Sequence, residues 1–176
     1  MRMISPVLIL SIVLVVATAK AQFLDSILII NPDDVITALK FKKKGVMPFG
    51  FKPGTSILNL KKAMGMVEIF KEDSTYITYT LYFSKDKYDF GDITYEFIDS
   101  MLTEVSMETY FGDKKPAVKT LNLFKKHFDK IYKGGTYANN TLNWEYTKKG
   151  VHLKVHLAEV EFEDDNGFVI DFLTGK

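Results

Sequence analysis

Hydrophobic and polar residues follow two different periods along this chain, and each period predicts one kind of secondary structure. Apolar residues recur every three or four positions in 32–44, 56–64 and 116–133, which predicts three helices, the last of them long. End signals support this prediction, because Asn31 is a good N-cap and Gly134 stops the longest stretch.

Most of the remaining chain alternates with a period of two, which is typical of half-buried strands. In 151–163 the apolar positions are odd up to Leu157 and even from Ala158 onward. A strand that changes its inward face needs a β-bulge or a sharp bend, so we predict one of these near 157–158, where it would curve the sheet around the long helix. The predicted strands cover residues 66–72, 75–84, 92–99, 101–111, 141–147, 151–163 and 168–173.

The order of these elements predicts an α+β fold. We expect a curved antiparallel sheet of about seven strands, packed by the helix at 116–133 and by two shorter N-terminal helices. Residues 22–176 are expected to form one domain. Within it, a helix followed by a meander occurs twice, in units at 53–112 and 113–176.

The residues at the two ends of the second predicted helix resemble those of known families. Gly54-Thr55-Ser56 precedes this helix and Ala63-Met64-Gly65 ends it. With these residues, the arrangement resembles the tandem helix-plus-sheet plan of secreted beta-lactamase inhibitor proteins. Its first unit also resembles small outer-membrane assembly lipoproteins, and the resemblance covers that first unit.

The N-terminus is typical of an export signal. Arg2 is followed by an apolar stretch at 7–16, and Ala19-Lys20-Ala21 fits a cleavage site. We therefore expect residues 1–21 to be removed and the mature chain to begin at Gln22, in a secreted or periplasmic location. An uncleaved anchor is the alternative. No later segment is long and apolar enough to cross a bilayer.

Composition excludes several classes of protein. Hydrophobic residues make up 47% and charged residues 26% of the chain, which is globular composition. The absence of cysteine excludes disulfides, thiolate metal sites and cysteine nucleophiles. Arg2 is the only arginine, so the mature chain lacks the residue that best recognises phosphate, and we expect no nucleic-acid partner.

Candidate catalytic and metal-binding residues are few. His152 and His156 are four residues apart in a predicted strand, about 13 Å, which is too far to share one metal ion. His127 lies among lysines on the long helix and is expected to be solvated. The acids of 159–165 fit an outer strand face and a turn better than a calcium loop. With no nucleophile motif, we predict no catalytic residue, no metal and no cofactor.

Aromatic residues supply the candidate binding site. Phe49 and Phe51 lie in a connector rich in proline and glycine, and Tyr76 and Tyr82 lie on a predicted strand. Exposed aromatics favour partner contact, so we expect these four to bind another exported or envelope protein. The alternative assigns such tyrosines to ordinary strand packing, with Tyr79, Trp144 and Tyr146 on the core face.

Two further features bear on the partner. A rival class is a small apolar ligand held between sheet and long helix, in a pocket lined by Met101, Met107, Phe124 and Phe128. Charge is also uneven: residues 31–62 carry seven lysines against two aspartates, and residues 151–176 carry two lysines against six acids. Such a dipolar surface can steer a partner or meet an anionic membrane.

Overall fold

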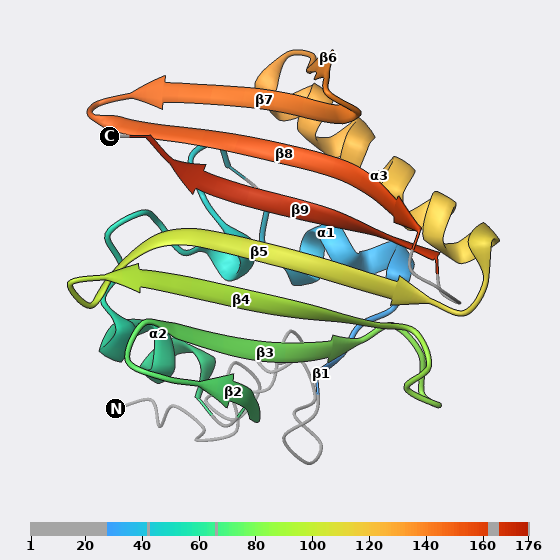
Figure 1. Cartoon of the computed structure of the whole chain (residues 1–176), viewed down its shortest axis with the longest axis horizontal. Helices are drawn as coiled ribbons and strands as arrows, with labels where there is room; N and C mark the ends of the chain where they lie inside the picture. The colour runs from blue at the N-terminus through green and yellow to red at the C-terminus, as the bar shows by residue number, and fades with distance from the viewer. Residues whose placement is uncertain (1–27, 42, 66, 162–165, 176) are drawn as a thin grey trace, which may run out of the picture.

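The structure is a computed structural model of the chain and describes residues 28–41, 43–65, 67–161 and 166–175. This part has an α+β fold with one open, mostly antiparallel sheet of nine strands and three α-helices, one of them long (Figure 1). The helices are α1 (Val35–Ala38), α2 (Ile57–Met64) and α3 (Lys114–Tyr132). The strands are β1 (Leu28–Ile29), β2 (Ile69–Glu72), β3 (Tyr76–Tyr82), β4 (Phe90–Ile98), β5 (Met101–Phe111), β6 (Thr136–Ala138), β7 (Thr141–Lys148), β8 (Val151–Glu161) and β9 (Asn166–Thr174).

The strands are arranged in the order β1-β3-β4-β5-β9-β8-β7-β6. Strand β2 is off this path and pairs with the same edge of β3 as β1 does. All neighbours are antiparallel except β1 and β3. The sheet has more strands than the seven expected because β1 and β6 are only two and three residues long, too short to show a period. β5 and β9 lie at the centre and join the two halves.

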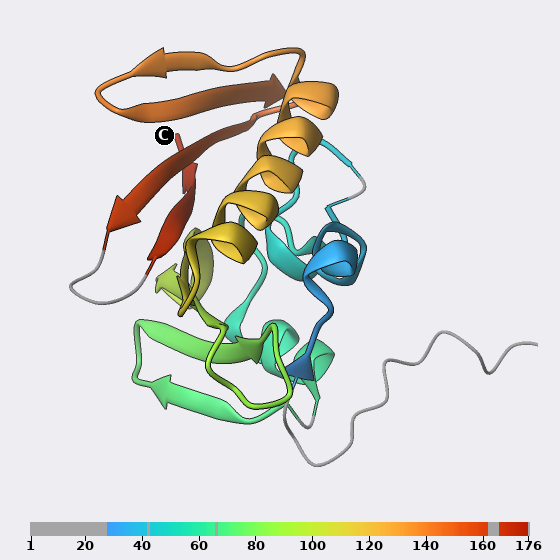
Figure 2. The same ribbon diagram turned by 90° about the vertical axis from the view of Figure 1, so that its right-hand side faces the viewer.

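The helices gather on one side of the sheet, as Figure 2 shows, and the core lies between them and the sheet. The Phe128 ring on α3 lies 5.3 Å from the Trp144 ring on β7 and 6.0 Å from the Phe172 ring on β9. Phe124, one turn earlier, lies 5.6 Å from Phe168. This aromatic layer confirms the amphipathic pattern of the long helix, which begins at Lys114 rather than at Pro116.

The prediction of a helix over 32–44 is wrong in its second half. A 3-10 turn at Pro32–Asp34 leads into α1, which ends at Ala38, and Lys40 takes a left-handed conformation with φ 57°. The cause is that Leu39 and Phe41 are both buried. Residues two apart point to different sides of a helix, so the chain must leave the helix to bury both. Phe41 then stacks on Phe172 with ring centroids 5.4 Å apart.

The bulge predicted near 157–158 is also wrong. The β8–β9 ladder runs without a register shift through Leu157↔Ile170 and Ala158↔Val169. Leu157 is buried on the helix side, whereas Ala158 and Val160 are half-buried on the opposite face. Ala158 and Val160 therefore make the outer face apolar at this end of β8, while the odd-numbered residues continue to face the helices.

A bulge lies instead between β4 and β5, at Glu96/Phe97. It reverses the phase of β5, so Leu102 is buried while Met101 is 44% exposed. The expected N-cap Asn31 is confirmed, since it accepts a hydrogen bond from the Asp33 N–H. For α2 the sequence allowed Thr55 or Ser56 as the cap, and Ser56 accepts the bond from the Asn59 N–H.

Two predictions lie wholly or partly outside the described residues: the export signal at 1–21, and residues 162–165, which cover the end of the strand predicted at 151–163 and the first half of the turn predicted at 164–167. No helix in the described ranges combines the length and the apolar character that a bilayer span requires.

Candidate functional site: the open face of the sheet

One face of the sheet carries none of the helices that the structure describes, and we call it the open face; the viewer looks onto it in Figure 1. Its residues alternate with the buried residues of the same strands, as the pleat requires. Because register places residues of neighbouring strands directly opposite one another, they form rows across the sheet. They are Tyr76, Thr78, Thr80 and Tyr82 on β3; Phe90, Asp92, Thr94 and Glu96 on β4; Glu104, Ser106, Glu108 and Tyr110 on β5; Val169, Asp171 and Leu173 on β9; and Lys154, His156 and Ala158 on β8.

An aromatic row crosses one end of the open face. Tyr82 pairs with Phe90, and Phe90 pairs with Tyr110, on three adjacent strands. The Phe90 ring stacks on Tyr110 at 4.7 Å and lies 6.5 Å from Tyr82. The Lys87 ammonium lies over the Tyr82 ring, 5.4 Å from its centroid. The row therefore presents apolar area with polar tips at the surface.

A shallow depression of about 310 Å³ adjoins this row. Phe70 on β2 forms one wall and is 67% exposed. The Asp92 carboxylate forms part of the lining and accepts a 2.6 Å hydrogen bond from the Thr80 hydroxyl. The remaining lining residues are Thr80, Tyr82, Lys87 and Phe90.

Carboxylates face one another along the middle of the open face. Register sets Asp92 opposite Glu108 and Glu96 opposite Glu104. Like charges directly opposite one another on neighbouring strands destabilise a sheet. Burial raises the pKa of Asp92, the Thr80 hydrogen bond partly opposes this, and Glu108 raises it further. Burial also raises the pKa of Glu104, with Glu96 and Asp171 adding to the effect.

A polar row lies between these acidic pairs. The Thr78 and Thr94 hydroxyls lie 2.9 Å apart, and the Ser106 hydroxyl donates to Asp171 at 2.8 Å. His156 is opposite Asp171 on the next strand. The Ser106 hydroxyl therefore bonds to a carboxylate, and this contact orients it on the open face.

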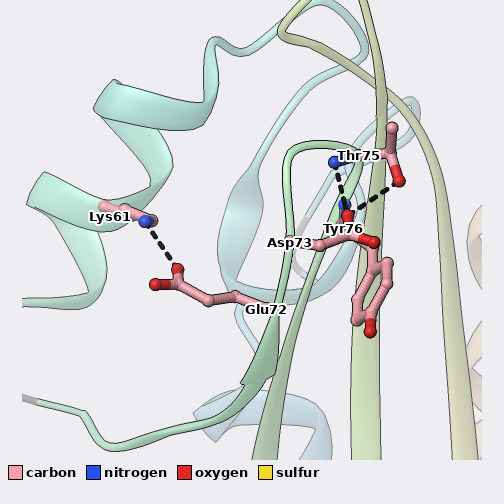
Figure 3. A network of polar contacts seen from close by, with 5 residues as sticks. All are labelled: Lys61, Glu72, Asp73, Thr75 and Tyr76. Atoms are coloured by element: carbon pink, nitrogen blue, oxygen red, sulfur yellow. Dashed lines mark hydrogen bonds and ion pairs between the residues drawn. The ribbon is translucent and has the colours of Figure 1, made fainter.

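A turn at the edge of the sheet positions Tyr76. The Asp73 carboxylate accepts hydrogen bonds from the Thr75 N–H, the Thr75 hydroxyl and the Tyr76 N–H, as Figure 3 shows. These bonds from Thr75 lower the pKa of Asp73. On the other side of the same turn, Lys61 on α2 forms a 2.6 Å ion pair with Glu72. Helix α2 is thereby tied to the edge strand that precedes Tyr76.

The structure separates the four predicted partner-binding residues into two pairs. Tyr76 and Tyr82 share the open face of β3. Phe49 and Phe51 are half-buried and pack against the hydrophobic core on the helix side. The Phe51 ring meets the ring of buried Tyr95 edge-on at 5.7 Å. The tyrosine pair therefore belongs to the open face, and the phenylalanine pair lines a small pocket of about 90 Å³ on the helix side.

The four residues of the alternative pocket differ in their burial. Met107, Phe124 and Phe128 are fully buried among other core side chains, and Met101 is at the exposed start of β5. A groove of about 300 Å³ does lie between α3 and the sheet, beside different residues. Its apolar lining is Val118, Leu121, Leu142 and Leu157, and its polar lining is Asn122, Lys125, Tyr137, Asn140 and Glu159.

The histidine predictions have different outcomes. His127 is half-buried rather than solvated, and its Nε2 lies 2.6 Å from the Phe41 carbonyl oxygen. Burial lowers the pKa of His127, while this hydrogen bond opposes the shift. His152 and His156 share one face of β8, as expected. Across the described ranges, no three His, Asp or Glu side chains are grouped so that they could hold a metal ion.

Sequence reasoning missed most of the open face. Alternation identifies which residues of a strand share a face, and it placed Tyr79 and Trp144 correctly in the core. It does not give the register between strands, so the stacking of Phe90 on Tyr110 and the Asp92–Glu108 pair were not predicted. The signal available was the alternation of acids with threonines and serines in 92–108.

Comparisons with known proteins gave no family model, no curated relative and no solved structure that matches this chain.

Proposed function

We propose that this chain is an exported, non-catalytic module that binds another protein through the open face. The observation that carries the proposal is the row Tyr82–Phe90–Tyr110 next to facing carboxylates on a sheet surface that no helix covers. Aromatic residues are enriched at the centres of protein interfaces. Facing carboxylates cost stability, and a cost of this kind is typical of surfaces kept for binding.

The proposed arrangement is a pair of helix-plus-meander units. The first consists of α2 followed by β2–β5, and the second of α3 followed by β6–β9. The antiparallel pairing of β5 with β9 supports this interpretation, since it makes the last strand of each unit the seam. Both units then contribute to one surface, which gives a partner more contact area than either half alone.

The export part of the proposal rests on the pattern of residues 1–21, with a secreted or periplasmic location as its consequence. The absence of cysteine fits an exported chain large enough to fold without disulfides.

Affinity capture from the native host tests the proposal. The wild-type protein is compared with the double variant Tyr82→Ala/Phe90→Ala and with a control, Leu58→Ala, which removes a side chain on α2 that is 75% exposed. We expect one protein to be captured by the wild type and by the control and to be lost with the open-face variant. Capture that survives in the open-face variant, with its fold intact by circular dichroism, contradicts the proposal.

A second candidate function is binding of a small apolar ligand, and the groove between α3 and the sheet favours it. Its volume of about 300 Å³ is at the lower end of ligand sites. Native mass spectrometry of protein purified gently from its host distinguishes the two. The variant Leu121→Trp fills the groove. A bound mass of a few hundred daltons that is present in the wild type and absent in this variant supports binding of a small ligand.

A further inference from the structure

A stripe of lysines runs along the outer side of α3, and we call it the lysine face. Lys115, Lys119, Lys126 and Lys130 follow one another at spacings of four, seven and four residues, which places them on one side of α3, and Lys133 follows the last helical turn as its left-handed cap. All five are exposed. They lie opposite Phe124 and Phe128, which fix the buried side of the helix.

The stripe is long and straight. From Lys115 to Lys130 it extends about 22 Å along the helix axis. Helix α3 faces the viewer in Figure 2, on the side of the molecule away from the open face. A row of this length can touch a flat surface with all of its ammonium groups together.

Little negative charge offsets the stripe. Asp129 is the only acid within α3, and its carboxylate is engaged on the sheet side, where it accepts hydrogen bonds from the Trp144 indole N–H and from the Gly135 N–H. Lys119 forms a 2.6 Å ion pair with Asp33. The other four lysines of the stripe make no ion pair with any residue that the structure describes.

We propose that the lysine face docks the protein on an anionic lipid bilayer, with the open face directed away from the membrane. Lysine presents a compact point charge and lacks the planar fork with which arginine grips a single phosphate. A row of such charges suits the diffuse negative field of a lipid surface better than one defined anionic group. The expected export route also brings the chain to a membrane surface.

Co-sedimentation with lipid vesicles tests this proposal. The mature chain expected after export, which begins at Gln22, is mixed with vesicles of phosphatidylglycerol and phosphatidylcholine in equal parts, or of phosphatidylcholine alone. We expect binding to the anionic vesicles in excess of binding to the neutral ones. Raising the salt from about 0.1 M to about 1 M should abolish the excess, because the Debye length falls from about 10 Å to about 3 Å.

Variants locate the contact. Each lysine near an anionic surface strengthens binding by roughly fivefold, so Lys126→Gln/Lys130→Gln should weaken it by about 25-fold. Lys87→Gln/Lys154→Gln removes the same charge from the side of the open face and serves as the control, with little effect expected. Equal weakening by both double variants, or equal binding to neutral and anionic vesicles, overturns the proposal. Because partner capture is read separately, either result leaves the proposed function untouched.

Discussion

Glu104 lies directly opposite Glu96 on neighbouring strands of the open face, where both carboxylates point away from the helices. A sheet selected only for stability would place a lysine or a threonine at one of these positions. The same relationship recurs two rungs along the ladder, between Asp92 and Glu108. The repulsion is thus a property of the whole middle of the face.

Replacing Glu104 with glutamine should therefore stabilise the protein. Glutamine keeps the shape of the side chain and removes the charge that faces Glu96. We expect a gain of about 0.5 kcal/mol in the free energy of unfolding, measured by urea denaturation. Glu145→Gln, which removes an acid that pairs with Lys154 on β8, serves as the control and should not stabilise.

The gain from Glu104→Gln should depend on pH. The folded-state pKa of Glu104 is raised, so its carboxylate destabilises the fold at neutral pH and ceases to do so once it is protonated. The difference in stability between the variant and the wild type should be largest at neutral pH. It should shrink as the pH falls through the folded pKa of Glu104. A difference that grows toward acid pH would show that the sign is wrong.

The packing of Phe41 against the second half of the chain should be essential. Its ring contacts Phe124 and Phe128 on α3 and stacks on Phe172 on β9. Phe41→Ala should lower the free energy of unfolding by about 3–5 kcal/mol because it leaves a cavity at the centre of the core. Phe70→Ala removes an equal side chain from an exposed position and should change stability little.

Phe51 and Tyr82 should differ in what they support. Phe51 packs edge-on against buried Tyr95, so Phe51→Ala should cost about 2 kcal/mol of stability. Tyr82 lies on the open face, and Tyr82→Ala should cost clearly less while weakening partner capture. Thermal unfolding of the two variants side by side checks this. A larger loss of stability for Tyr82→Ala would contradict the division between a structural and a binding aromatic.

The local pattern was sufficient for the elements that carry their own signals. Ser56 and Gly65 bracket α2, and the period of three to four residues gave α3 to within two residues. It failed where tertiary packing decides the outcome. The burial of Phe41 against Phe172 ends a helix that the following lysines would favour extending. The bulge at Glu96/Phe97 reverses which residues of β5 face the core. Neither the end of the helix before Phe41 nor the bulge can be recognised from the neighbouring residues, because each depends on packing against residues that are distant in the sequence.

The candidate site shows the same division. Tyr76 and Tyr82 could be assigned to one face of a strand from alternation alone. Their neighbours across the sheet could not, because register is fixed by pairing between strands, and paired residues are up to sixty-nine positions apart, as in Glu104↔Leu173.

Site-specific photo-crosslinking in the native host tests the central claim most directly. A photoreactive amino acid is placed at Phe90, in the aromatic row of the open face, and in a separate variant at Asn122, on the outer side of α3. Binding through the open face predicts a discrete protein adduct at position 90 and none at position 122. A protein adduct at 122 alone, or no protein adduct at either position, would contradict it.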